Sequence, residues 1–483
     1  VEMMDWIRLK RVDIFNLQNV EYGTITISPR DNNEPVDFKA DVLGIYGQNG
    51  SGKTTFVHAM GLLKKILNGH SLRDEALPYI TEGKEEAGMM AAFQLSVSGT
   101  MYYTEYKVML TKEKMDGNAE DGEKGPGVYV SQEELKVSAF DGTKWEKKHR
   151  LIAQDQGKEI VFSPQKLAKE IIGEKNDRLI NLLVAKRLAR RQYTSFFFST
   201  DAFPLLAGNG GTVLGRIFKA LQAYGRRYLY VIDTRGWGPI NMNAGLPLYF
   251  RVENKKNKRL AAGVVFFRLD KPTVLSKELY EPLKKVIAKM NPVLGELIPH
   301  LQLELKDMGE QVMKNGKEGM ALEAISIRSN SKVPLRYESE GIKKIVAILN
   351  MFIAAYADPS ITLVVDELDA GIFEYLLGEL LAIFESSGKG QLIFTSHNLR
   401  PLETLQKKAI VFTTVNPQNR YIRLKNIKPN NNLRSVYYGD IQLGGTPESL
   451  YEKTNNMAIE YALKRITRPV DKTEGPAWHI DRD

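Results

Sequence analysis

The sequence predicts an α/β fold in which a mixed sheet is combined with an antiparallel β subdomain and an inserted, mostly helical lobe. The first observation is a glycine-rich loop at 47–54, which follows a short apolar strand at 42–46 and opens a helix from Lys53 to about Leu67. The second is the pattern from Ser339 onward, which reads helix, strand, helix, strand and is typical of parallel sheets.

The antiparallel part is predicted by the alternation of apolar and polar residues. Residues 91–111 alternate in strand fashion, and a return strand is expected at Val128–Val137. The segment between them, Met115–Gly127, is rich in Gly, Asp, Glu and Lys, so we expect a hairpin tip there. Residues 7–28 predict two further strands around a turn near Glu21-Tyr22-Gly23.

The rest of the chain predicts an inserted lobe. Its expected elements are helices over most of 166–225, strands at Tyr228–Ile232 and Gly263–Leu269, and a helix at Lys277–Met290. A strand pair near 301–308 and 320–328 is expected to begin the next lobe. We therefore expect an N-terminal lobe at 1–160, an inserted lobe at 161–300 and a C-terminal lobe at 301–483.

The composition restricts the possible functions. The 483 residues include no cysteine, which excludes disulfides, thiolate zinc sites, iron–sulfur clusters and cysteine nucleophiles. The first residues lack a signal-peptide core and no apolar stretch is long enough to span a bilayer, so we expect a soluble, cytoplasmic protein that does not enter a membrane. The net charge of +9 permits contact with nucleic acid but also fits a mildly basic surface, and basic clusters lie at 147–150, 186–191 and 255–259.

The loop at 47–54 has the pattern of a phosphate-binding P-loop. Glycines let backbone N–H groups curl around a phosphate, and the start of the following helix adds unpaired donors. Lys53 is expected to reach the β- and γ-phosphates of ATP, and the Thr54 hydroxyl to ligate Mg²⁺. The predicted nucleotide-binding residues of this segment are Gly47, Asn49, Gly50, Ser51, Gly52, Lys53, Thr54 and Thr55.

A pair of acids follows a second apolar strand. Residues 361–365 form a continuous apolar run that delivers Asp366 and Glu367. In a P-loop enzyme the first acid is expected to hold Mg²⁺ and the second to act as general base toward the attacking water. Two adjacent carboxylates also serve as helix caps, and it is their combination with the P-loop that favours catalysis.

Two further segments fit the same chemistry. Ser339 and Gly341 open an apolar helix, whose exposed N–H donors suit a γ-phosphate, although an ordinary helix cap gives the same pattern. His397 follows the apolar strand 392–394 and is placed to reach the γ-phosphate or the attacking water, although a lone histidine is usually structural.

In this order, the four segments resemble the ATP-binding-cassette (ABC-type) ATPase heads of SMC-like, RecF-like and OLD-like proteins, mainly over 5–67 and 336–445. The resemblance assigns 47–54 to the Walker A motif, Ser339-Glu340-Gly341 to the signature motif, and Asp366-Glu367 to the Walker B motif. It assigns Asp369-Ala370-Gly371 to the D-loop, with Asp369 at the nucleotide, and His397 to the switch histidine. Lys53, Glu367 and His397 are the implied catalytic residues, and ATP and Mg²⁺ the implied cofactors.

The sequence departs from the family pattern in three places. The D-loop continues to Ile372 and Phe373 instead of ending in a second aspartate, and Glu338 stands where many relatives have leucine. Gln94 and Gln165 are two weak candidates for the Q-loop glutamine. No zinc hook, long arm or fused Toprim-type nuclease is indicated.

The resemblance is closest to AbiL-like prokaryotic AAA-family ATPases, several of which belong to anti-phage systems such as Septu and PARIS. It implies a head-to-tail homodimer or higher homo-oligomer that senses infection and controls a separate effector, such as a nuclease or toxin. A RecF- or SMC-like role in DNA repair or chromosome maintenance is the alternative, and it would add DNA as a partner.

Overall fold

A computed structural model describes residues 4–28, 38–73, 76–113, 127–155, 160–173, 177–208, 210–254, 259–313, 315–328, 331–424, 432–444 and 447–467. The chain divides into two compact units, Val1–Leu450 and Tyr451–Asp483. The second unit contains one described helix, α12 (Asn456–Thr467). None of the helices among the described residues is both long and apolar enough to cross a membrane.

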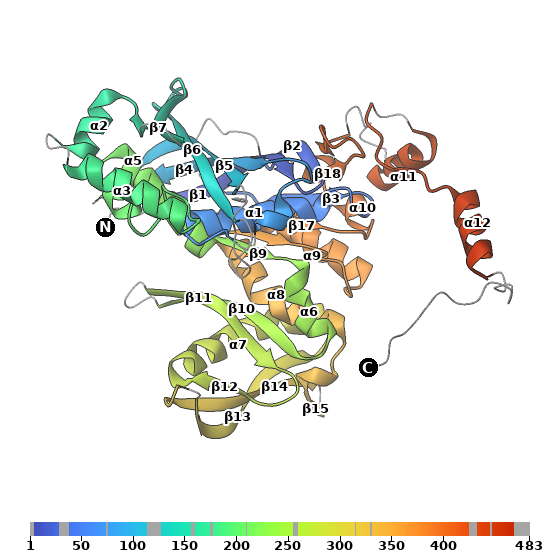
Figure 1. Ribbon diagram of the computed structural model, residues 1–483. Coiled ribbons are helices and arrows are strands. Elements are labelled where there is room, and N and C mark those ends of the chain that lie inside the picture. Colours follow the sequence, from blue (N-terminus) through green and yellow to red (C-terminus); the bar gives the residue numbers. More distant parts are fainter. Residues whose placement is uncertain are drawn as a thin grey trace, which may run out of the picture. The chain divides into compact units, whose positions relative to one another are not determined.

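A six-stranded sheet forms the centre of the first unit (Figure 1). Its order is β19 (Tyr421–Ile422), β18 (Ile410–Thr413), β3 (Asp41–Tyr46), β17 (Gln391–Thr395), β16 (Thr362–Val365) and β9 (Leu229–Ile232). All its pairings are parallel except that of β19 with β18. The segment expected as an inserted lobe thus supplies β9, an edge strand of this sheet.

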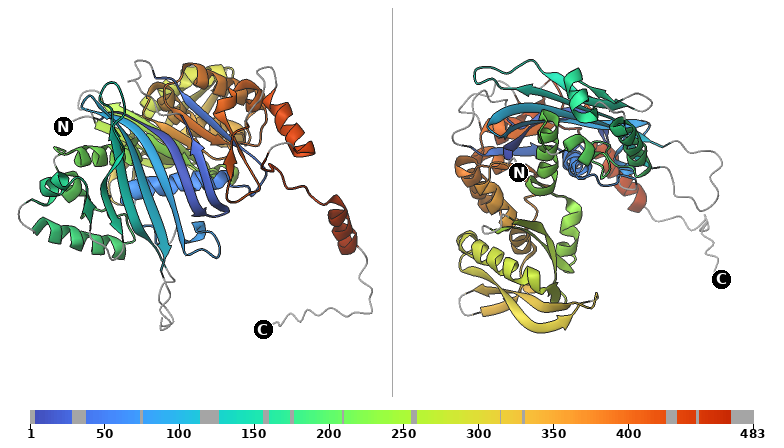
Figure 2. Two further views of the ribbon diagram at one scale, coloured as in Figure 1. Left: turned by 90° about the horizontal axis from the view of Figure 1, so that it is seen from above. Right: turned by 90° about the vertical axis from the view of Figure 1, so that its left-hand side faces the viewer.

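A seven-stranded antiparallel sheet is the second layer. Its order is β2 (Val20–Thr26), β1 (Met4–Leu17), β4 (Glu86–Val97), β5 (Thr100–Lys112), β6 (Val128–Ala139), β7 (His149–Asp155) and β8 (Val161–Phe162). The helix α1 (Lys53–Leu67) lies between the two sheets, and one apolar core joins its side chains to both (Figures 1 and 2). The predicted α/β fold with an antiparallel β subdomain is therefore confirmed. Most of the expected hairpin tip between β5 and β6 lies outside the described residues.

The turn between the first two strands lies earlier than predicted. The strands meet at Gln18 and Asn19, and Gly23 is inside β2. A Cβ on Gly23 would come 2.4 Å from the ring of Tyr421, so this glycine makes room for a packed aromatic side chain. Gly23 is therefore a packing glycine within a strand and not the turn glycine that the sequence pattern suggests.

The helices after β8 pack with the antiparallel sheet and α1. They are α2 (Gln165–Ile172), α3 (Asp177–Arg191), α4 (Phe203–Ala207) and α5 (Val213–Ala223), so the expectation of a mostly helical stretch is correct. A short π-helical turn at Tyr224–Tyr228 leads from α5 into β9.

The lobe that follows β9 packs on the helix α8 (Glu340–Ala357) (Figures 1 and 2). It comprises α6 (Thr234–Asn241), β10 (Gly245–Asn254), β11 (Arg259–Arg268), β12 (Thr273–Ser276), α7 (Lys277–Leu297), β13 (Leu301–Val312), β14 (Glu318–Arg328) and β15 (Ser331–Pro334). β10 was not predicted, and α7 runs past Pro292 to Leu297 because Leu294 is buried in the core on the far side of that proline.

The remaining helices flank the parallel sheet. They are α9 (Glu374–Ser387), α10 (Pro401–Thr404) and α11 (Leu433–Leu443), with short 3₁₀ turns at Leu77–Tyr79, Leu335–Tyr337 and Lys407–Ala409.

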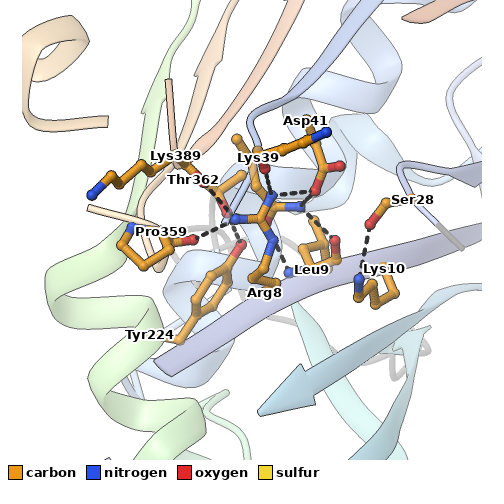
Figure 3. Close-up of polar contacts among 11 residues, drawn as sticks. Arg8, Leu9, Lys10, Ser28, Lys39, Asp41, Tyr224, Pro359, Thr362 and Lys389 are labelled. Carbon is orange, nitrogen blue, oxygen red and sulfur yellow. Dashed lines mark hydrogen bonds and ion pairs between the residues drawn. The ribbon is translucent and has the colours of Figure 1, made fainter. Parts of the chain in front are cut away.

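Arg8 on β1 fastens the antiparallel sheet to the amino ends of the parallel strands (Figure 3). Its side chain is almost fully buried. Nη1 donates to the carbonyls of Pro359 (3.1 Å) and Lys389 (2.6 Å), and Nη2 donates to the carbonyl of Lys39 (3.0 Å) and the Asp41 carboxylate (2.5 Å). Three chain segments far apart in sequence are thereby held at the sheet edge opposite the predicted P-loop.

Candidate functional site

The carboxyl ends of the parallel strands bring the predicted site together. In a parallel sheet these ends share one edge, where loops bind ligands. β3 leads into Gly47, β16 into Asp366 and Glu367, and β17 into His397. One strand, β17, separates the P-loop strand from the strand that carries the acids.

Lys53 lies inside the loop that it would use to hold a phosphate. Its Nζ donates to the carbonyls of Gly47 (2.8 Å) and Gln48 (2.9 Å), and the side chain is buried. Burial lowers the pKa of Lys53, against the attraction of Asp366 and Glu367. The ammonium group thus lies against the backbone of the loop that the sequence predicts to bind a phosphate.

Residues from distant strands shape the loop. Thr413 at the end of β18 lies so close that a Cβ on Gly47 would come 1.7 Å from its Oγ1, and its hydroxyl is 2.5 Å from that of Ser51. The Tyr421 hydroxyl donates to the carbonyl of Gly52 (2.7 Å). Gly52 has φ +99°, a left-handed conformation that glycine adopts without strain.

The turn between β1 and β2 supports the loop from the other sheet. The Asn19 side chain donates to the carbonyl of Gly50 and accepts from the Thr55 hydroxyl (2.9 Å). Gln18 accepts from the same hydroxyl (2.9 Å). Of the P-loop residues predicted to bind nucleotide, Thr55 therefore faces this turn.

A magnesium site is suggested by the arrangement of Asp366. This residue is fully buried; its Oδ1 lies 3.4 Å from the Thr54 hydroxyl and accepts from the Thr395 hydroxyl (2.5 Å). Its Oδ2 is buried and has no hydrogen-bond partner among the described residues. A buried carboxylate oxygen without a partner is costly, and a hard cation held by carboxylate, hydroxyl and phosphate oxygens would satisfy it. The residues present therefore fit Mg²⁺.

Glu367 has a backbone conformation that is uncommon for its type. Its φ is +49°, and its N–H donates to the Thr395 hydroxyl at 2.8 Å. Such left-handed conformations cluster at functional sites when the surrounding structure holds them. Here Thr395 binds both acids, Asp366 through Oδ1 and Glu367 through the backbone.

Asp369 and His397 are joined through the loop after β17. The backbone N–H groups of His397 (3.2 Å) and Asn398 (3.0 Å) donate to Oδ2 of Asp369, while its Oδ1 is buried without a partner among the described residues. Burial lowers the pKa of His397, and the positive charge of Lys53 lowers it further. His397 is therefore neutral near pH 7 and able to accept or donate one hydrogen bond.

The predicted signature residues lie beside the D-loop of their own chain. Ser339 caps α8, its hydroxyl accepting from the N–H of Ile342 at 3.4 Å. Gly341 packs directly on Gly371, since a Cβ on Gly341 would come 1.9 Å from the Gly371 carbonyl oxygen. Lys53 and Thr54 instead contact the ends of β3 and β16, so the site residues form two groups that meet through the segment 366–371.

The weak Q-loop candidates do not belong to this arrangement. Gln94 is buried in β4 of the antiparallel sheet, and Gln165 is exposed at the start of α2. The glutamine beside the P-loop helix is Gln18, whose side chain also bonds Nδ1 of His58 (3.1 Å). Gln18 lies in the turn between β1 and β2, which the sequence pattern places nearer to Gly23, so its contact with this helix was not predicted.

The basic clusters differ in how their charge is used. Lys148 pairs with Glu105 and Arg150 with Glu134, both at 2.6 Å. Lys186 donates to the Asp155 carbonyl, and Arg190 lies over the ring of Tyr129. The side chains of the third cluster lie outside the described residues.

No protein-family model and no curated protein matches the sequence. Solved structures with similar folds include the Smc head with an extended coiled coil bound to the C-terminal domain of ScpA from Pyrococcus furiosus (12% identity, TM-score 0.33, 86% of this chain and 96% of that one). Others are the SMC head domain from Thermotoga maritima (15%, 0.33, 87% and 100%) and the recombination mediator RecF with ATP (14%, 0.31, 81% and 94%).

Proposed function

We propose that the protein is an ABC-type ATPase that binds ATP and hydrolyses it with Mg²⁺. The observation that carries this proposal is the buried Asp366 carboxylate, which lies beside Thr54 of the P-loop and has one oxygen without a partner. Lys53 and Glu367 lie at the same edge of the sheet, so a phosphate cradle, a cation site and a general base are adjacent.

The chain's own residues have distinct tasks in this mechanism. Lys53 exchanges its bonds to the Gly47 and Gln48 carbonyls for the β- and γ-phosphate oxygens of ATP. Thr54 and Asp366 would hold Mg²⁺, which neutralises the charge that develops on the phosphates. Glu367 orients and deprotonates the attacking water, and neutral His397 donates a hydrogen bond to the γ-phosphate.

We further propose that a second copy completes the site. Ser339 and Gly341 contact α8 and Gly371 of their own chain, whereas Lys53 and Thr54 contact the ends of β3 and β16. The surface around them carries exposed aromatic side chains: Tyr337 is 70%, Phe373 69% and Tyr375 50% exposed. Large aromatic residues grouped on a surface are typical of protein interfaces. Head-to-tail pairing of two copies would cover them and place each signature turn on the other copy's γ-phosphate.

Substitution of Glu367 by Gln tests the proposed activity. The variant should bind ATP as tightly as the wild type in calorimetry, while its turnover falls about 100-fold or more because the general base is lost. Glu379→Gln is the matched control, since Glu379 is an exposed glutamate on α9. Wild-type turnover in Glu367→Gln, or no ATP binding by either chain, would contradict the assignment.

A role in anti-phage defence is the finer proposal, and it is supported by the sequence resemblance alone. In that role the ATP-dependent dimer controls a separate effector protein, so phage protection should disappear in Lys53→Met and be altered in Glu367→Gln. The alternative, clamping of DNA in repair or chromosome maintenance, requires DNA binding that depends on ATP and weakens steeply with salt. Filter binding at 50 and 200 mM salt separates the two.

A further inference from the structure

The helix α6 connects the acids of the site to the lobe that packs on α8, and one of its residues reaches Asp366. The backbone N–H of Asp366 donates to the carbonyl of Ile232, at the end of β9 (2.8 Å). Five residues later, the buried Trp237 donates from Nε1 to the carbonyl of Asp366 (2.9 Å). Both backbone groups of this acid are therefore held by the segment 232–237.

The same tryptophan also contacts the signature helix. Lys344, in the second turn of α8, places its Nζ 5.5 Å from the centre of the Trp237 ring. Lys344 is buried, and burial lowers its pKa, while Glu340, Glu367 and Asp369 attract its charge. A buried ammonium needs such compensation, and the aromatic face and the nearby carboxylates supply it.

The neighbouring lysine has different surroundings. Lys343 is equally buried, but its Nζ donates to the side chain of Asn243 (2.8 Å), and the carboxylates that attract it are Glu340 and Glu338. Of these two adjacent lysines on α8, Lys344 is therefore the one that lies over Trp237, and its charge is the one attracted by Glu367 and Asp369.

We propose that Trp237 and Lys344 are a pair of positioning residues that link the acids of one site to the signature turn of the same chain. This inference rests on the proposed function, in which that turn serves the ATP site of a second copy. The pair fixes the position of the Ser339–Gly341 turn relative to Glu367 of the same chain. ATP binding at one site therefore also sets the position of the turn that closes the second site. The two sites of a dimer are then cooperative.

The test compares Lys344→Met, which keeps the apolar stem, with the matched control Lys343→Met. We expect Lys344→Met to lower kcat about 10- to 100-fold, since misplacement of catalytic groups by about 1 Å has that effect, with the dissociation constant for ATP changed less than about threefold. The Hill coefficient for ATP should fall from above 1 in the wild type to 1. Lys343→Met should keep the wild-type kcat and Hill coefficient, and Lys344→Arg should recover a large part of both.

Trp237 gives an independent readout. Nucleotide binding should change the tryptophan fluorescence of the wild type, and Trp237→Phe should remove most of this change while Trp6, Trp145 and Trp478 remain. In a double-mutant cycle, Trp237→Leu and Lys344→Met should have a combined effect on kcat well below the product of their single effects.

Two results would overturn the inference without touching the proposed ATPase activity. One is a Lys344→Met variant that matches Lys343→Met in kcat and Hill coefficient; the other is multiplicative behaviour in the double-mutant cycle. If Lys344→Met fails to fold, Trp237→Phe, which removes the donor to the Asp366 carbonyl, decides by its kcat and Hill coefficient compared with Lys343→Met. A wild-type protein that neither binds nor hydrolyses ATP would instead defeat the proposed function itself.

Discussion

Substitution of Gly341 by Ala tests the contact between the signature turn and the D-loop. An added Cβ would come 1.9 Å from the carbonyl oxygen of Gly371, whereas real Cβ atoms essentially never approach another heavy atom within 3.0 Å. The obstructing atom belongs to the backbone, so α8 and the D-loop must separate by about 1 Å. Because a displacement of that size in a catalytic arrangement costs about 100-fold in rate, we expect kcat to fall by about this factor.

The assay is steady-state ATP hydrolysis, with ATP affinity measured separately by calorimetry. Affinity should change less than about threefold, since Lys53 and Thr54 are not displaced. Gly439→Ala on α11 is the control: a Cβ there meets no atom within 4 Å, and the variant should hydrolyse ATP as the wild type does. Wild-type turnover in Gly341→Ala would refute the reasoning that this contact fixes the geometry of hydrolysis.

Three further predictions concern other parts of the molecule. Arg8→Met should lower the free energy of unfolding in urea by about 3–5 kcal/mol, because it removes the cation that pairs with Asp41 and the donor to three backbone carbonyls; an unchanged urea midpoint would contradict this. His397 should titrate with a midpoint below 6.5 in NMR, and Lys53→Met should raise that midpoint because it removes a neighbouring positive charge; a midpoint unaffected by Lys53→Met would argue against their proximity. Phe373→Ser should weaken ATP-dependent pairing about 10-fold in sedimentation experiments, and equal pairing would remove this residue from the interface.

The P-loop and the acids after β16 were predictable because each depends on local chemistry. A strand, a glycine-rich loop and a helix follow one another within 26 residues at 42–67, and an apolar run ends directly at Asp366. The parallel sheet then brings both to one edge, as the strand pattern implies. The antiparallel sheet was equally visible, since alternation along β4 to β6 needs no knowledge of the partner strand.

Other residues were not predictable because their partners are distant in sequence. Thr413 contacts the P-loop although it lies hundreds of residues away in sequence, and Asn19 does so from tens of residues away. Neither residue belongs to a recognisable motif. Trp237 is an ordinary buried aromatic residue until the structure places it on Asp366. β10 was missed because Pro247 argues against a strand within a sheet, whereas this strand belongs to a two-stranded hairpin that packs on α8.

A site shared between two copies is tested most directly by the mass in solution of Glu367→Gln and of the wild type. It is measured by light scattering on a sizing column, with and without ATP and Mg²⁺. ATP with Mg²⁺ should double the mass of Glu367→Gln, because bound ATP joins the P-loop of one copy to Ser339 and Gly341 of another and is not hydrolysed. The same addition to Lys53→Met should leave the mass unchanged. A mass of Glu367→Gln that does not respond to ATP would contradict a site completed by a second copy.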